Sequence, residues 1–160
     1  MSYGITITNQ QGEPLHTALP HHLYGGTYCL DTTELYLNIT YNYSPFYYRA
    51  ETLGESTKVY GDKPVDGCLP VLREEYGGIP GLAYLTIPQA RELVLKAIQH
   101  LRDEPLDENG NLYEPESLFD GDRIHATSYW APTEANARRA LVNLLQLLCL
   151  APDNSKIQIS

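Results

Sequence analysis

Apolar and polar residues alternate in three short parts of the chain, and this alternation predicts three β-strands. Ile5 and Ile7 alternate with threonines near the start, and Ile157 and Ile159 alternate with polar neighbours near the end. The clearest pattern runs from 35 to 44, where every second residue is apolar. Side chains on a strand point alternately to its two faces, so each segment has one apolar face. Strands of this kind belong to a sheet that is covered on one side.

Two longer segments repeat apolar residues at helical spacing, and both carry start signals. The first helix is expected over 87–103, because Thr86 is a capping residue and Gln89, three residues later, completes a capping box. The second helix is expected over 134–150, with Thr133 as its cap. The second half of this helix is apolar nearly all round, which predicts burial in the core or against another subunit.

These elements predict an α+β fold. Ser44 and Pro45 match a helix cap followed by proline at the first helical position, so a short third helix is expected to about Leu53. Residues 13–34 are rich in proline, glycine and histidine, which predicts mostly loop. We expect a mostly antiparallel sheet with one face packed on the two long helices, in a single domain spanning 1–160.

The charge balance excludes several classes of partner. Asp and Glu number 20 against 11 Lys and Arg, and the formal charge is −9. DNA, RNA and anionic lipid all attract basic surfaces, so we expect no direct nucleic-acid binding and no membrane binding. The N-terminal residues carry no signal-peptide pattern, and the longest apolar segment, 140–151, is too short to span a bilayer. These features predict a cytoplasmic protein.

The sequence carries no recognisable catalytic or metal-binding signature. It has no Gly-x-Ser-x-Gly motif, no glycine-rich phosphate loop and no His-Glu-x-x-His, and its histidines and cysteines are scattered. Cys149 falls in an apolar helical pattern, which predicts a small buried side chain. Asp107, Asn109 and Asn111 have the spacing that opens a calcium loop but lack its glycine and glutamate, so Asn109-Gly110 is interpreted as a hairpin turn. We expect no catalytic residue, no metal and no cofactor.

A row of hydrogen-bonding side chains forms the first candidate site. One face of the strand expected over 35–44 carries Asn38, Thr40, Asn42 and Ser44. The row leads to the start of the short helix, whose free N–H groups attract anions, and Tyr47 and Arg49 follow. These residues would read the polar edges of a small ligand while the helix end holds its phosphate or carboxylate. The alternative is a solvent-facing polar strand with an ordinary helix cap.

An aromatic segment before the second long helix forms the other candidate site. Tyr129 and Trp130 precede the cap Thr133, and Asn136 lies in the first turn. An aromatic ring beside a helix N-terminus stacks on a base or ribose while the helix end holds a phosphate. The alternative is a tryptophan that closes the core. The chain has 13 tyrosines against 2 phenylalanines, and tyrosine is favoured at recognition surfaces, so composition favours binding over catalysis.

These pieces together resemble a family of small uncharacterised proteins from phages and bacteria. In that family a strand ends in Asn-x-Thr-x-Asn-x-Ser-Pro and enters a short helix, and two long helices, an intervening tryptophan and a short closing strand follow. The corresponding pieces here are 38–45, 87–103, Trp130, 134–150 and 156–160, roughly the last three quarters of the chain. The resemblance implies no chemistry, but its phage context implies a protein that counters host defence.

Two functions are therefore expected as alternatives, and an enzyme is a third, less favoured one because the catalytic motifs are missing. The first is a non-catalytic phage-type anti-defence sponge that sequesters a small phosphorylated nucleotide signal, of the cyclic oligonucleotide or ADP-ribose type, in the host cytoplasm. The second is an acidic inhibitor, of the immunity-protein or nucleic-acid-mimic kind, that blocks a basic host or toxin protein. With either function, we expect the apolar helix over 134–150 to support a homo-oligomer.

Overall fold

The structure, a computed structural model, describes residues 1–27, 31–55, 77–114 and 130–160. The strands of this part of the chain are β1 (Ser2–Thr8), β2 (His16–His21), β3 (Thr32–Glu34), β4 (Tyr36–Thr40) and β5 (Lys156–Ile159). Its helices are α1 (Ser44–Tyr47), α3 (Ile87–His100) and α4 (Glu134–Leu150), together with the 3₁₀ helices η1 (Tyr41–Tyr43) and η2 (Pro80–Tyr84). The predicted α+β fold is confirmed.

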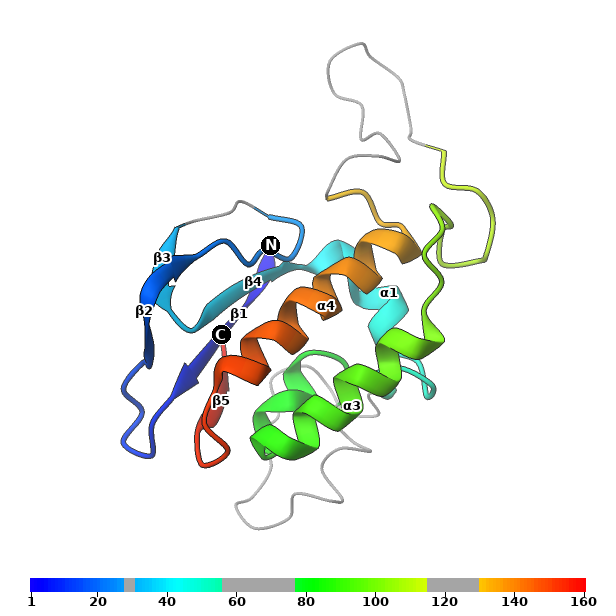
Figure 1. Cartoon of the computed structure of the whole chain (residues 1–160). Helices are drawn as coiled ribbons and strands as arrows, with labels where there is room; N and C mark the ends of the chain where they lie inside the picture. The colour runs from blue at the N-terminus through cyan, green and yellow to red at the C-terminus, as the bar shows by residue number, and fades with distance from the viewer. Residues whose placement is uncertain (28–30, 56–76, 115–129) are drawn as a thin grey trace.

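An antiparallel three-stranded sheet has the strand order β4-β1-β5, and β2 and β3 form a separate antiparallel pair (Figure 1). The register places Ile5 of β1 opposite Leu37 on one side and Ile159 on the other. Ile5 and Leu37 are fully buried, so the apolar face that the alternation predicted is the face turned to the core. The strands predicted at the two ends of the chain are confirmed.

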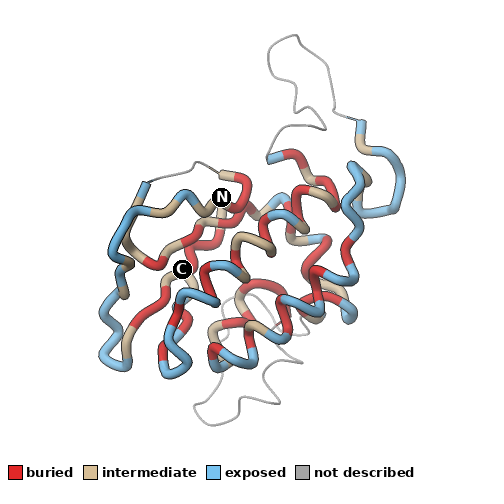
Figure 2. Tube along the Cα trace, in the orientation of Figure 1, coloured by how far each residue is buried: buried red, intermediate tan, exposed pale blue. Residues whose placement is uncertain are grey.

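The helix α4 runs between the sheet and α3 (Figure 1), and buried residues gather along the sheet and on the facing sides of the two long helices (Figure 2). Both predicted caps are formed. The Thr86 hydroxyl accepts the Gln89 N–H at 3.3 Å, the Gln89 side chain accepts the Thr86 N–H at 3.0 Å, and the Thr133 hydroxyl accepts the Asn136 N–H at 3.2 Å. The helix α4 has the predicted bounds, whereas α3 ends at His100, three residues before the predicted end.

Three predictions about local structure differ from what the structure shows. Residues 13–34, predicted to be mostly loop, contain β2 and β3; β2 is largely exposed, so no buried face imposes the alternation by which a strand is recognised. The strand predicted to continue to Ser44 ends at Thr40, because the Thr40 hydroxyl accepts the Asn42 N–H and starts η1. The short helix that follows has four residues, where a longer one was expected.

The apolar side chains of α4 are mostly buried within this chain: Ala137, Ala140, Leu141, Leu144, Leu147 and Leu148. The core thus accounts for most of the apolar character of this helix, and the expected homo-oligomer stays a prediction. Cys149 in its last turn is exposed, so the predicted burial of this thiol is wrong. It lies next to Leu150, which is also exposed, on the side of α4 that turns away from the core. None of the helices in the described ranges is long and apolar enough to cross a lipid bilayer.

Arg91 of α3 closes the C-terminal end of α4. Its guanidinium donates to the carbonyl oxygens of Leu148 at 2.9 Å and Ala151 at 2.6 Å, and it pairs with Asp153 at 2.6 Å. The last carbonyl groups of a helix have no partner within the helix, and a cation there also interacts favourably with the helix dipole. One side chain therefore ties the two long helices together.

Two glycines bring distant parts of the backbone into contact. The Gly78 N–H donates to the Gly54 carbonyl oxygen at 3.1 Å. A Cβ atom on Gly77 would lie 1.8 Å from that same oxygen, so only glycine permits this approach. The chain at 54 and the chain at 77 consequently lie side by side.

Candidate binding groove

An open groove of about 730 Å³ lies between α1, the segment 107–114 and Pro132. Its apolar lining includes Pro45, Phe46, Leu112 and Pro132. Its acidic lining consists of Asp107, Glu108 and Glu114. The groove therefore combines apolar lining residues with carboxylates and carries no basic lining residue within the described part of the chain.

The acidic wall of the groove is a short hairpin. The Gly110 N–H donates to the Asp107 carbonyl oxygen at 3.1 Å, and Leu106 and Leu112 form a β-bridge. Gly110 has a φ of +82°, which glycine adopts without strain. The Asp107 carboxylate accepts the backbone N–H groups of Asn109 and Asn111 at 2.9 and 3.0 Å, so local hydrogen bonds fix the turn. The hairpin turn predicted from Asn109-Gly110 is thus present.

The same part of the chain closes the N-terminal end of α4. The Glu134 N–H donates to the Leu106 carbonyl oxygen at 2.8 Å, and the Ala135 N–H donates to the Glu104 carbonyl oxygen at 3.0 Å. The Asn136 N–H donates to its cap, as described above. The first three N–H groups of α4 therefore have partners within the chain, and no free donor is left there to hold a phosphate.

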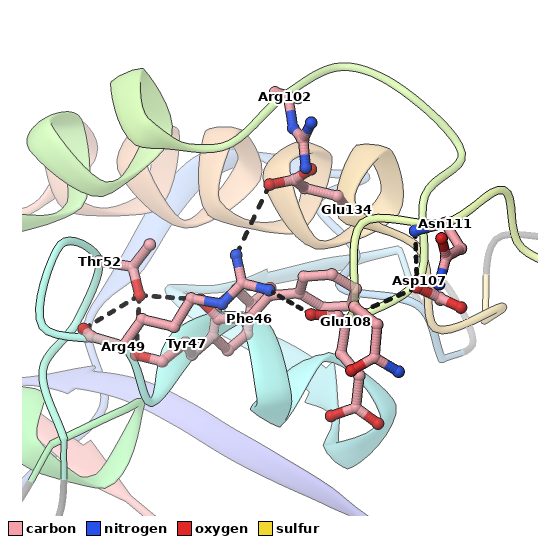
Figure 3. Close-up of polar contacts among 10 residues, drawn as sticks. Phe46, Tyr47, Arg49, Thr52, Arg102, Asp107, Glu108, Asn111 and Glu134 are labelled. Atoms are coloured by element: carbon pink, nitrogen blue, oxygen red, sulfur yellow. Dashed lines mark hydrogen bonds and ion pairs between the residues drawn. The ribbon is translucent and has the colours of Figure 1, made fainter.

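Glu134, in the first turn of α4, is only 3% exposed and is held by two arginines (Figure 3). Arg102 donates to one carboxylate oxygen at 2.9 Å, and Arg49 lies 3.7 Å from the other. Arg49 also donates to the Glu108 carbonyl oxygen at 3.1 Å, and its guanidinium lies 5.2 Å from the centre of the Phe46 ring. A buried carboxylate needs such partners, because an uncompensated charge in the interior is costly. The guanidinium groups of both arginines are therefore engaged in contacts with other residues of the same chain.

Tyr47, predicted to contact a ligand, lies in the core instead. Its ring is fully buried, and its hydroxyl donates to the Ala137 carbonyl oxygen of α4 at 2.9 Å. Burial, together with the nearby Tyr43, raises the pKa of this hydroxyl well above the usual 10.0. Tyr47 therefore joins α1 to α4 and has no surface to offer a ligand.

The other predicted polar residues do not form one row. The Asn38 side chain donates to the Tyr36 hydroxyl at 3.1 Å, and Thr40 is buried and caps η1. Ser44 lies 3.3 Å from the Tyr3 hydroxyl. Because the strand ends at Thr40, Asn42 leaves the face that it was expected to share with Asn38. The predicted alignment of the four residues is wrong.

The structure does bring the two predicted sites into contact at one point. The Asn42 side chain donates to the Trp130 carbonyl oxygen at 2.9 Å, across 88 residues of sequence. The Trp130 side chain is 37% exposed, so it does not close the core. Thr133 and Asn136 are buried, and the Asn136 side chain donates to the Ala131 carbonyl oxygen at 3.1 Å. Tyr129 lies outside the described residues.

The residues that line the groove were not among the predicted site residues, although the sequence carries a signal for them. Five carboxylates occur between 103 and 114: Asp103, Glu104, Asp107, Glu108 and Glu114. That density marks an acidic surface, but it does not show that Pro45 and Phe46 lie opposite. Among the described residues, no three His, Cys, Asp or Glu side chains gather in a way that would hold a metal ion. No family model, curated protein or solved structure matches the chain at a significant level.

Proposed function

We propose that this protein is a non-catalytic binding protein whose groove takes up a basic segment of another protein. The observation that carries the proposal is the groove itself, in which Asp107, Glu108 and Glu114 line the same space as the exposed apolar residues Pro45 and Leu112. Lysine and arginine side chains suit this combination, because their methylene stems pack on apolar surface while their charged ends reach carboxylates.

The charge of the whole chain supports the same kind of partner. A formal charge of −9 attracts a basic protein over distance and accelerates its association. Glu108 and Glu114 are exposed, so they contribute directly to the field at the groove. Occupation of a basic surface on a toxin or a nucleic-acid-binding enzyme would block that surface, which is the action of an inhibitor of the immunity-protein or nucleic-acid-mimic kind.

A phosphorylated nucleotide is the less favoured ligand. Its phosphates would face three carboxylates in the groove, and like charges at short range cost free energy. The first N–H groups of α4 and the guanidinium groups of Arg49 and Arg102 already have partners within the chain. A nucleotide signal therefore serves as the competing ligand in the test.

Isothermal titration calorimetry with four probes tests the proposal. The probes are a peptide of alternating arginine and leucine, the matched peptide with glutamate in place of arginine, a cyclic dinucleotide and ADP-ribose. We expect binding of the arginine peptide alone, weakened at least about tenfold between about 50 mM and about 300 mM salt, because salt screens exposed charges. Binding of a nucleotide without the arginine peptide, or equal binding of both peptides, would contradict the proposal.

A further inference from the structure

We propose that Glu134 is a positioning residue that holds Arg49 and Arg102 in ion pairs, so that neither guanidinium pairs with the side-chain carboxylates of the groove and the groove retains its negative charge. This inference rests on the proposed function, because it explains how the groove remains selective for a basic segment. It goes further in assigning a role to a residue that lines no part of the groove.

The first step of the argument is that both arginines converge on one buried carboxylate. Arg102 reaches one oxygen of Glu134 at 2.9 Å, and Arg49 approaches the other at 3.7 Å (Figure 3). Glu134 cannot turn to water, because it is 3% exposed at the start of α4. Its position in the first helical turn also favours a negative charge. The carboxylate is therefore a fixed partner for both cations.

The second step is that both guanidinium groups already lie at the acidic hairpin. Arg49 donates to the Glu108 carbonyl oxygen at 3.1 Å. A terminal nitrogen of Arg102 lies 3.5 Å from the position that a Cβ atom on Gly110 would occupy. If Glu134 lost its charge, the nearby partners for these cations would include the hairpin carboxylates of Asp107 and Glu108. The two arginines would then neutralise part of the negative charge of the groove.

The test combines a single and a double variant. Glu134→Gln is expected to weaken binding of the alternating arginine–leucine peptide roughly fivefold, about the effect of losing one exposed ion pair. Glu134→Gln with Arg102→Gln is expected to restore affinity to within about twofold of the wild type, because the more exposed of the two released cations is then absent. The matched control is Glu92→Gln on the exposed face of α3, which removes the same charge and is expected to change the affinity less than about twofold.

A second measurement does not depend on any peptide. The side-chain carboxyl ¹³C NMR signals of Asp107 and Glu108 are expected to shift in Glu134→Gln and to return in the double variant. If the wild type binds no basic peptide, the proposed function is overturned, and these signals still decide whether Glu134 holds the arginines. Unchanged signals in Glu134→Gln would overturn the inference, even if the peptide binds the wild type.

Two further outcomes would overturn the inference. The first is that Glu134→Gln and Glu92→Gln bind the arginine–leucine peptide with equal affinity. The second is that the double variant does not regain affinity for the peptide, because this result would show that Glu134 only supports the fold. If Glu134→Gln does not fold, Arg102→Gln alone decides, since Arg102 is 57% exposed and Arg49 remains 3.7 Å from the Glu134 carboxylate as its partner. Its affinity is expected within about twofold of the wild type; a gain of about fivefold would show that Arg102 already neutralises the groove.

Discussion

The guanidinium of Arg91, in the second turn of α3, donates a hydrogen bond to the carbonyl oxygen of Leu148 in the last turn of α4. The same side chain reaches Ala151 and Asp153, so it fastens the start of α3 to the end of α4. Arg91→Ala is expected to lower the free energy of unfolding by about 1–3 kcal/mol, because charge-assisted bonds to helix-end carbonyls are lost. Urea denaturation measures the change. Lys96→Ala, on an exposed position of α3, is the control and is expected to change it by less than about 0.5 kcal/mol.

Tyr47→Phe is expected to cost about 1 kcal/mol near neutral pH. The substitution removes the hydrogen bond to the Ala137 carbonyl oxygen and leaves the packing of the ring in place. Chemical denaturation of the two proteins at the same pH gives the difference. A loss of more than about 3 kcal/mol would show that the hydroxyl has a further role in the core.

The pH dependence of the same pair provides a separate prediction. Burial raises the pKa of Tyr47 above the usual 10.0, so above about pH 10 the unfolded chain releases a proton that the folded protein keeps. The contribution of this group to stability is fully present below that pH and is lost as the pH rises further. Tyr47→Phe removes the contribution, so the stability difference between the two proteins is expected to shrink between about pH 8 and about pH 11. A constant difference across that interval would contradict the assignment.

Gly77→Ala is expected to be among the most damaging single substitutions of a glycine in the described part of the chain, because Gly77 is buried against backbone. The added Cβ would overlap the Gly54 carbonyl oxygen, and both partners in this contact are backbone, so neither can swing aside. The expected loss is about 2–4 kcal/mol, measured by thermal or urea unfolding. Gly12→Ala is the control, because no atom lies within 4 Å of its Cβ position and only the positive φ of +84° opposes the change. A similar loss in both variants would mean that steric overlap at Gly77 is relieved.

The charge of the groove is tested by Glu108→Gln combined with Glu114→Gln. Both side chains are exposed, so the fold is expected to keep its stability within about 0.5 kcal/mol. Affinity for the arginine–leucine peptide is expected to fall about tenfold, and its dependence on salt is expected to become weaker. Glu92→Gln combined with Glu51→Gln removes two exposed acidic groups outside the lining of the groove and is the matched control. Equal loss in the two pairs would place the peptide elsewhere.

The long helices were predictable because their signals are local. Thr86 with Gln89, and Thr133 alone, mark helix starts through hydrogen bonds that span three residues. The strands at the two ends were predictable because burial of one face imposes alternation on neighbouring residues. In contrast, the strand ends after Thr40 because the Thr40 hydroxyl accepts a hydrogen bond from the Asn42 N–H. The alternating pattern of the sequence does not reveal this hydrogen bond.

The candidate site was less predictable because its geometry depends on contacts between distant residues. Asn42 and Trp130 are both predicted site residues, and they meet through the Asn42 side chain and the Trp130 backbone carbonyl. Tyr47 was expected at a surface because it follows the polar row, whereas its contact with Ala137 places it inside. The groove requires α1 to face the hairpin at 107–114, and no spacing in the sequence encodes that juxtaposition.

The backbone contact between Gly54 and Gly77 gives the segment that joins them two attachment points that nearly coincide. Backbone atoms alone make this contact, so no side-chain charge contributes to it. We therefore expect the junction of these two distant points of the chain to be insensitive to pH and to salt, unlike the ion pairs around Glu134.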